Sequence, residues 1–402
     1  MKAVILAAGE GTRMRPLTKN RPKVMLPVGN CPILQHVIEQ VKGADITDIV
    51  LVIGYHSDTI IDYFKDGRAF GVNMEYVVQK ERLGTANAIG VAEPLINERF
   101  LVLNGDVMTT SAQIKTLRSY NEPVVMTAHE VDNPQAFGVL EVNNGHVTHV
   151  HEKPEIPPTN LANAGIYIFG PEVFEYIKKT SLSSRNEYEI TQTILEMINS
   201  KINVGYRIIK EKWLDIGRPW DLLDANTEFL TTITEDIKGE VEGGVHILGP
   251  VVVEKGARIR SGAYIEGPVI IGSKSDIGPN CYIRPYTSIG REVRIGNAVE
   301  IKNSIIMDNT HVGHLSYVGD SIIGTNCNFG AGTKVANLRH DGANIKVKIN
   351  GVIMDSGCRK LGTIMGDNVH TGINSILNVG TIIEPDSNIM PGEFIRYNYG
   401  RW

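Results

Sequence analysis

The sequence lacks the features of several protein classes. Its four cysteines (Cys31, Cys281, Cys327 and Cys358) lie far apart and form no CxxC pair, which argues against a disulfide framework or a zinc site and fits a reducing cytoplasm. No apolar run approaches the ~18 residues of a membrane span. The 40 basic residues nearly balance the 45 acidic ones, and no block of one sign stands out. Nucleic acid and membranes are therefore not expected partners.

Glycine, in contrast, is abundant in one half of the chain. Residues 1–238 contain 16 of the 41 glycines, close to the usual share of ~7%, whereas residues 239–402 contain 25. A chain of 402 residues is long enough for two domains that each bury a core. We therefore expect a first domain over 1–222, a linker helix over 223–240 and a second domain over 241–402.

A six-residue repeat explains the composition of the second half. A β-branched aliphatic residue recurs at every sixth position from Val253 to Ile301, often followed by glycine, and the pattern resumes after two five-residue steps. This period fits neither an amphipathic helix nor a long alternating strand. It predicts a β-solenoid in which three hexads close one coil and glycine frees the corners. An excursion over 337–362 interrupts the repeat. The pattern resembles the left-handed parallel β-helix of the hexapeptide-repeat transferases, from which we take the handedness.

The first half alternates short apolar runs with helix-like segments. This pattern predicts an α/β, Rossmann-like domain with a mostly parallel sheet. The first run ends in a turn that contains Gly9 and Gly11, and such a turn presents backbone N–H groups to phosphate. The third glycine of a dinucleotide fingerprint and the lysine-serine pair of a Walker motif are both missing, so neither of these classes fits.

The residues around this turn form a more specific motif. The run L-A-A-G-x-G-T-R-M-x-P-L-T-x-x-x-P-K-x-x-x-P-V resembles the signature of the sugar-phosphate nucleotidyltransferases. Those enzymes transfer a nucleotidyl group from an NTP to a sugar 1-phosphate and release pyrophosphate. The resemblance implies that the nucleotide is bound by Ala8, Gly9, Gly11, Thr12, Gln79, Gly84 and Thr85. It implies that the sugar phosphate is bound by Gly138, Glu152, Lys153 and Asn163.

Catalysis in such a site depends on positioning and charge neutralisation, because like charges must approach in line. Arg13 and Lys23 are the expected catalytic cations. Asp106 and Asp215 are hard oxygen ligands suited to Mg²⁺. The segments P-L-T (16–18) and W-L-D (213–215) look more like those of thymidylyltransferases, whereas R-M (13–14) and G-T-A (84–86) look like those of uridylyltransferases. UTP and dTTP are therefore both candidate donors.

The solenoid carries polar residues of its own. Arg284 and Lys302 each follow a ladder residue and are 18 positions apart, so we expect them to stack one coil apart, with a repulsion that an anionic ligand would relieve. The surrounding segments (R-P-Y-T, V-E-I-K-N-S, H-L-S-Y-V-G-D and C-N-F-G-A-G-T) resemble the acetyltransferase half of the bifunctional GlmU-type enzymes. The resemblance makes His314 the general base. It assigns the amino-sugar phosphate to Arg284, Glu300, Lys302, Tyr317, Asn328 and Asn337.

These observations predict an enzyme that makes UDP-N-acetylglucosamine from glucosamine 1-phosphate, acetyl-CoA and UTP. By resemblance, it is expected to be a cytoplasmic homotrimer that binds small molecules only. One alternative is a glucose-1-phosphate thymidylyl- or uridylyltransferase with a purely structural β-helix, and the polar residues of the solenoid argue against it. A second alternative is a catalytically silent subunit that senses sugar nucleotides. The presence of Arg13, Lys23, Asp106 and Asp215 argues against that reading.

Overall fold

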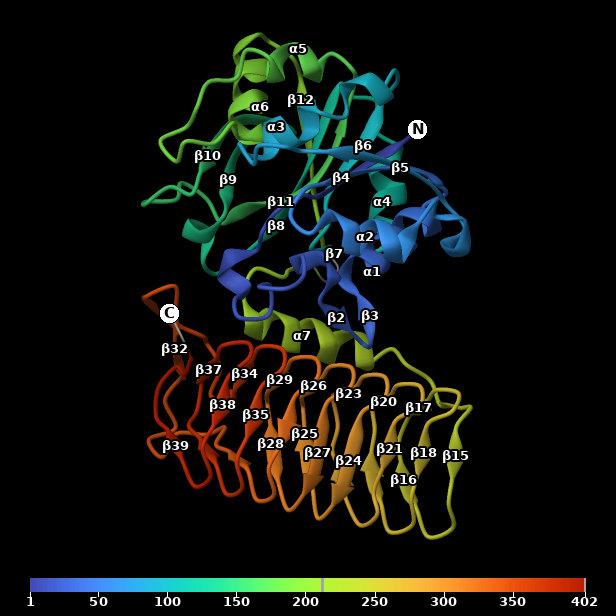
Figure 1. The fold of residues 1–402 in the computed structure, drawn as a ribbon. Helices are drawn as coiled ribbons and strands as arrows, with labels where there is room; N and C mark the ends of the chain where they lie inside the picture. Colours follow the sequence, from blue (N-terminus) through green and yellow to red (C-terminus); the bar gives the residue numbers. More distant parts are fainter. Residues whose placement is uncertain (211–212, 401–402) are drawn as a thin grey trace. The chain divides into compact units, whose positions relative to one another are not determined.

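The computed structural model describes residues 1–210 and 213–400, which form two compact units (Figure 1). Met1–Glu10 and Ile33–Asp215 form the first unit. The second unit contains the chain from Ile216 onward and, in addition, the segment Gly11–Pro32. Part of the nucleotidyltransferase signature therefore packs with the C-terminal half of the chain. No helix in the described part is long and apolar enough to cross a membrane.

The first unit is built on a nine-stranded sheet with the order β5-β4-β1-β6-β11-β8-β12-β10-β9. Its strands are β1 (Ala3–Ala7), β4 (Asp48–Ile53), β5 (Asn73–Val78), β6 (Phe100–Asn104), β8 (Val124–Glu130), β9 (Gly138–Asn143), β10 (His146–Glu152), β11 (Leu161–Phe169) and β12 (Val204–Ile208). The helices are α1 (Ile33–Gly43), α2 (Ser57–Phe64), α3 (Thr85–Gly90), α4 (Ser111–Arg118), α5 (Val173–Ile177) and α6 (Ile190–Asn199). A separate two-stranded ribbon pairs β7 (Val107–Met108) with β13 (Leu214–Asp215).

The sheet is mixed, and the expectation of a mostly parallel sheet is wrong for its second half. Strands β5, β4, β1 and β6 run parallel, as βαβ connections require, whereas β11 is antiparallel to both β6 and β8. β9 and β10 form a hairpin whose turn residues, Asn144 and Gly145, have φ of 49° and 82°. An Asn-Gly pair favours this kind of turn. The sequence therefore contained the signal for a hairpin at this point.

The second unit is a left-handed parallel β-helix of three eight-stranded sheets, called faces 1, 2 and 3 here, with its coils stacked side by side in Figure 1. Face 1 contains β14 (Asp236–Ile237), β17 (Val251–Val253), β20 (Val269–Ile271), β23 (Thr287–Ile289), β26 (Ile305–Ile306), β29 (Ile322–Ile323), β34 (Ile364–Met365) and β37 (Ile382–Ile383). Face 2 contains β15 (Glu240–Val241), β18 (Arg258–Ile259), β21 (Asp276–Ile277), β24 (Arg294–Asn297), β27 (His311–His314), β30 (Asn328–Phe329), β35 (His370–Thr371) and β38 (Asn388–Ile389). Face 3 contains β16 (His246–Leu248), β19 (Tyr264–Glu266), β22 (Tyr282–Ile283), β25 (Glu300–Lys302), β28 (Tyr317–Gly319), β31 (Lys334–Val335), β36 (Ile376–Leu377) and β39 (Phe394–Ile395).

The hexad register is confirmed. Val253 pairs with Ile271 and Ile265 with Ile283, each 18 residues apart, and the ladder side chains are buried in one continuous core. The excursion contains the hairpin of β32 (Lys346–Ile349) and β33 (Val352–Asp355). The glycines that follow ladder residues have two causes: Gly278 has a left-handed backbone (φ 100°), as expected, whereas others are needed for close stacking. A β-carbon on Gly324 would lie 2.5 Å from the Gly366 carbonyl oxygen, so glycine there permits close stacking of coils.

One helix and a short ribbon complete the second unit. The helix α7 spans Pro219–Leu230 rather than 223–240, with proline in its first turn, and β2 (Pro27–Val28) pairs with β3 (Cys31–Pro32). The fully buried Asn226 of α7 accepts hydrogen bonds from the Gly29 amide (2.9 Å) and the Ser288 hydroxyl (2.7 Å). This one side chain therefore fastens the helix to both the N-terminal segment and the β-helix.

Candidate active sites

Two strand ends in the nine-stranded unit carry the predicted metal ligands. β6 ends at Asn104, and the amide of Gly105 still donates into β1, so Asp106 follows directly on the parallel part of the sheet. The pairing of β13 with β7 places Asp215 opposite Val107, the neighbour of Asp106. The structure thus brings both aspartates to one edge of the sheet, where ligands bind in open α/β folds.

The paired aspartates fit a magnesium ion. Mg²⁺ prefers oxygen ligands and usually takes one or two carboxylates, with substrate phosphates and water completing its shell. Within residues 1–210 and 213–400, no group of three or more His, Cys, Asp or Glu side chains is arranged to hold a metal ion. Two carboxylates suit an ion that arrives with a nucleotide better than a permanently bound structural metal.

The four residues predicted to bind the sugar phosphate gather where β9, β10 and β11 meet. Gly138 pairs with Glu152, and a β-carbon on Gly138 would lie 3.2 Å from Oε2 of Glu152 and 3.5 Å from the β-carbon of Asn163. Lys153 follows in a left-handed conformation (φ 44°), and its amide donates to the carbonyl oxygen of Phe137, 3.1 Å away. A single glycine therefore opens the space between these polar side chains.

The Asn163 side chain is held in one orientation. Its Nδ2 donates to the Tyr167 hydroxyl (2.7 Å), and its Oδ1 accepts from the amide of Gly165 (3.2 Å). Burial raises the pKa of Tyr167 well above its usual range, so this hydroxyl stays protonated. The orientation of the amide is thus set before any ligand binds.

Glu152 has two partners that the sequence did not reveal. The Thr191 hydroxyl donates to its Oε2 (3.1 Å), and Arg185 donates to its Oε1 (3.2 Å) while also pairing with Glu189 (3.3 Å). Burial, together with the charge of Glu152, raises the pKa of Glu189. Arg185 therefore neutralises two neighbouring carboxylates. No local motif marks it, because its partners come from separate elements.

The predicted base-reading residues form a second group in this unit. The buried Gln79 donates through Nε2 to the Gly84 carbonyl oxygen (3.2 Å) and to Oδ1 of Asn87 (2.7 Å). Gly84 has φ of 108°, and the Thr85 hydroxyl accepts from the amide of Ile190 (2.9 Å). Both amide hydrogens of Gln79 are therefore used inside the protein, and its oxygen remains as the group that can read a base. Asn87 was not predicted.

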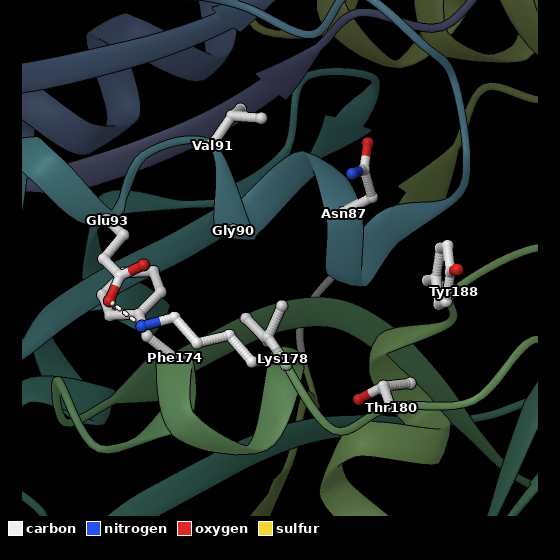
Figure 2. A pocket seen from close by; sticks show the side chains of 9 residues that line it. Asn87, Gly90, Val91, Glu93, Phe174, Lys178, Thr180 and Tyr188 are labelled. Carbon is white, nitrogen blue, oxygen red and sulfur yellow. Dashed lines mark hydrogen bonds and ion pairs between the residues drawn. The ribbon is translucent and has the colours of Figure 1, made fainter.

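Behind α3 lies a cavity of about 380 Å³ that contains none of the predicted nucleotide-binding residues (Figure 2). It is lined by Asn87, Gly90, Val91, Glu93, Phe174, Ile177, Lys178, Thr180 and Tyr188. An ion pair between Lys178 and Glu93 (2.7 Å) lies on its wall. Asn87 therefore borders this cavity and also holds Gln79.

The signature residues divide between the units. Ala8 and Gly9 end β1 in the nine-stranded unit, whereas Gly11, Thr12, Arg13 and Lys23 belong to the β-helix unit. Gly11 has a left-handed backbone (φ 66°), and a β-carbon there would lie 2.8 Å from the β-carbon of Lys23. Short 3₁₀ turns follow at Thr12–Met14 and Lys23–Met25. The glycine thus lets the two arms of the loop pack together.

Five of the predicted amino-sugar residues lie along face 3 in two bonded groups, Arg284 with Glu300 and Lys302 with Tyr317 and Asn337, which together are called the face-3 network here. Arg284 donates to Glu300 (2.9 Å), and the Nζ of Lys302 lies 3.1 Å from Asp320. The Asn337 side chain donates to the Tyr317 hydroxyl (3.0 Å) and to Asp320 (2.5 Å). Burial raises the pKa of Tyr317, and the hydrogen bond to Glu300 raises the pKa of Arg284. The buried Asp320, which was not predicted, joins Lys302 to Asn337 and, through Asn337, to Tyr317.

The predicted repulsion between Arg284 and Lys302 is wrong. Arg284 and Lys302 do lie one coil apart, because Ile283 pairs with Ile301, but each has its own carboxylate partner, Glu300 or Asp320. The repeat did not point to these partners, because Lys302 pairs in register with Gly319 and Asp320 is the residue after it, at the end of the strand. An anionic ligand would therefore add to an already neutralised pair.

His314 and Asn328 lie on face 2 instead. His314 is exposed at the end of β27 and pairs with Asn297, and Asn328 pairs with His311 one coil along. In the described chain, the His314 ring forms no hydrogen bond to the face-3 network. The structure therefore divides the predicted acetyl-transfer residues between two neighbouring faces of the β-helix.

Comparisons with known proteins agree with both halves of this description. The family model for nucleotidyl transferases matches residues 2–232, and the model described as the GMPPB C-terminal domain matches residues 265–392. A putative glucose-1-phosphate thymidylyltransferase from Bacillus anthracis, solved in complex with a sucrose, is similar in structure. It has a TM-score of 0.54 and 32% identity, and the match covers 59% of this chain and 98% of that one.

Two curated relatives match along nearly the whole chain. "Bifunctional protein GlmU" from Methanocaldococcus jannaschii is 47% identical over 93% of this chain and 89% of its own length. "Bifunctional sugar-1-phosphate nucleotidylyltransferase/acetyltransferase" from Sulfurisphaera tokodaii is 39% identical over 100% of this chain and 98% of its own. The chain therefore belongs to the bifunctional GlmU family of nucleotidyltransferases and acetyltransferases.

Proposed function

We propose that this enzyme makes UDP-N-acetylglucosamine in two steps. The amine of glucosamine 1-phosphate attacks the thioester of acetyl-CoA, which forms the amide and releases CoA. The phosphate of the product then attacks the α-phosphorus of UTP and releases pyrophosphate. The observation that carries this proposal is the face-3 network of Arg284, Glu300, Lys302, Tyr317 and Asn337, because a purely structural β-helix has no need of it. The monofunctional alternative leaves the network unexplained.

In the nucleotidyl-transfer step the chain binds, orients and neutralises. Arg13 and Lys23 provide positive charge for the triphosphate, and Gly11 keeps the loop open to phosphate oxygens. Asp106 and Asp215 would hold Mg²⁺, which when bound neutralises charge on the phosphates. Glu152, Lys153 and Asn163 bind the sugar, with Asn163 already oriented by Tyr167.

The choice of base follows from Gln79. Its two amide hydrogens are donated to Gly84 and Asn87, so its Oε1 is left to accept from a base. Uracil and thymine both present an N3–H donor, whereas the N3 of cytosine is an acceptor. The site therefore accepts UTP and dTTP and rejects CTP.

In the acetyl-transfer step His314 takes a proton from the substrate amine, and Arg284 with Lys302 binds the sugar phosphate. His314 is the last residue of β27 on face 2, and Asn328 lies on the same face. The homotrimer rests on the resemblance to the solenoid acyltransferases, which build their sites between subunits. A monomer in light scattering at assay concentration would contradict that assembly. Four free thiols fit a reducing cytoplasm as its location.

The test is product analysis of the full chain. Incubation with glucosamine 1-phosphate, acetyl-CoA, UTP and Mg²⁺ is expected to yield UDP-N-acetylglucosamine, pyrophosphate and free CoA. EDTA is expected to stop pyrophosphate release and leave CoA release intact. Pyrophosphate release from glucose 1-phosphate, with no CoA release from any amino sugar phosphate, would favour the monofunctional alternative.

A further inference from the structure

The nucleotidyltransferase signature is tied to the β-helix at Arg21, two residues before Lys23. One terminal nitrogen of Arg21 donates to Oδ2 of Asp367 (2.7 Å) and to the Thr325 hydroxyl (2.9 Å). The other terminal nitrogen contacts the sulfur of Met307 (3.6 Å). All of these residues belong to the same compact unit. Arg21 thus spans three coils of face 1 at their corners.

Asp367 is oriented by its own β-helix and not by Arg21 alone. Its side chain is 11% exposed, and its Oδ1 accepts from the amide of Thr325 one coil away (2.8 Å). One oxygen is therefore used to fix the carboxylate, and the other accepts from Arg21 and, at 3.4 Å, from the side chain of Asn20. A charge-assisted bond of this kind is stronger when it is shielded from water.

Other contacts hold the same segment on either side of Arg21. The Asn350 side chain, at the tip of the excursion hairpin, donates to the Thr12 carbonyl oxygen (3.1 Å). Lys19 pairs with the buried Glu384. Asn30 donates to the carbonyl oxygen of Ile289 (2.6 Å). Segment Gly11–Pro32 is therefore fastened to the β-helix along its length.

We propose that Asp367 is a positioning residue for nucleotidyl transfer, which acts through Arg21 to hold the loop that carries Lys23. The inference rests on the role proposed for Lys23. Pro22 links Arg21 to the 3₁₀ turn that starts at Lys23, and proline fixes its own φ. A shift in the position of Arg21 therefore shifts Lys23 as well. A displacement of ~1 Å in a positioned group can cost about 100-fold in rate.

The β-helix offers a matched control in Asp308, at the equivalent corner of an earlier coil. Its Oδ1 accepts from the amide of Arg291 (2.8 Å), and its Oδ2 accepts from the Arg291 side chain (2.8 Å). Asp308 thus makes the same backbone bond and the same kind of ion pair as Asp367, but its arginine belongs to the β-helix itself. Asp308→Asn alters the same two kinds of bond at a more exposed corner, where the Asp308 side chain is 32% exposed, and it leaves the Arg21–Asp367 pair in place.

The experiment measures steady-state pyrophosphate release from the full chain, with CoA release as the control for folding. Asp367→Asn and Arg21→Gln are each expected to lower kcat for pyrophosphate release about tenfold or more, with CoA release kept. Asp308→Asn is expected to change kcat less than twofold. The double variant is expected to be no worse than Arg21→Gln alone, because Asp367 acts through Arg21.

Two results distinguish a failure of the role proposed for Lys23 from a failure of the role proposed for Asp367. If Lys23→Ala keeps full pyrophosphate release, the proposed role of Lys23 is wrong, and the positioning role of Asp367 is overturned as well. If Lys23→Ala loses activity while Asp367→Asn and Arg21→Gln both keep the wild-type kcat, only the inference is overturned. It is also overturned if Asp308→Asn lowers kcat as much as Asp367→Asn, or if the two losses in the double variant simply add.

Discussion

Gly165 lies directly against the side-chain amide of Asn104: a β-carbon on Gly165 would be 2.6 Å from Nδ2 of Asn104. Gly165 also has a left-handed backbone (φ 73°). Asn104 ends the strand that leads to Asp106. Gly165→Ala should therefore push Asn104 away and disturb the metal-ligand edge, and we expect pyrophosphate release to fall about tenfold or more.

The control for this variant is Gly145→Ala. Gly145 has a similar φ of 82°, but a β-carbon there would meet nothing within 4 Å. Both variants should lose roughly 1–2 kcal/mol of folding free energy from backbone strain. Equal pyrophosphate release in the two variants would show that the approach of Gly165 to Asn104 does not matter for activity.

Asn87 is expected to set base selectivity through Gln79. Asn87→Leu removes the acceptor for one amide hydrogen of Gln79, so the amide can turn and present a donor to the base. The preference of kcat/KM for UTP over CTP should fall about tenfold or more. Asn87→Asp keeps an acceptor and should retain the preference. An unchanged UTP:CTP ratio in Asn87→Leu would contradict this assignment.

Asp320 is expected to matter for stability as well as for acetyl transfer. Its carboxylate accepts from Lys302, Asn303 and Asn337 and is almost fully buried. Asp320→Asn leaves the partly buried Lys302 cation without its counter-charge, which should lower the free energy of unfolding by about 3 kcal/mol. Chemical denaturation measures this loss.

Asp276→Asn provides the comparison for that measurement. Asp276 pairs with Arg260 and Arg294 on the solvent-facing surface of the β-helix, where an ion pair contributes about 0–1 kcal/mol. Equal destabilisation by the two variants would mean that the Asp320 network is no more than a surface feature.

The buried aliphatic side chains of the repeat should contribute most of the folding free energy of the β-helix. Ile301 is fully buried, so Ile301→Ala should cost about 2–5 kcal/mol. Ile376 also lies on face 3 but is 43% exposed, so Ile376→Ala should cost no more than about 0.5 kcal/mol. Denaturant titrations of the two variants compare them directly, and similar midpoints would argue against the ladder as the core.

The fold of the second half could be predicted from the sequence because its information is periodic. The spacing of Val253, Ile259 and Ile265 fixes which side chains point inward and which residues stack. Even the two five-residue steps reappear, as the 17-residue spacings between Ile289 and Ile306 and between Ile306 and Ile323. The mixed half of the nine-stranded sheet carries no such period: apart from the β9–β10 hairpin, pairs such as β11 with β6 join strands distant in the chain.

The candidate sites could be predicted only where short motifs carry them. Gln79 and Glu152 lie in recognisable segments, but the residues that orient them, Asn87 and Arg185, do not. Asp367 is 346 residues from Arg21 and belongs to an ordinary corner of the β-helix. Such partners are set by tertiary packing, which a single sequence does not display.

The central claim, that one chain performs two independent chemistries, is tested most directly by a crossed pair of variants. Asp106→Ala should abolish pyrophosphate release from UTP and N-acetylglucosamine 1-phosphate and keep CoA release from acetyl-CoA and glucosamine 1-phosphate. His314→Ala should do the reverse. Full CoA release in His314→Ala, or full pyrophosphate release in Asp106→Ala, would contradict the account.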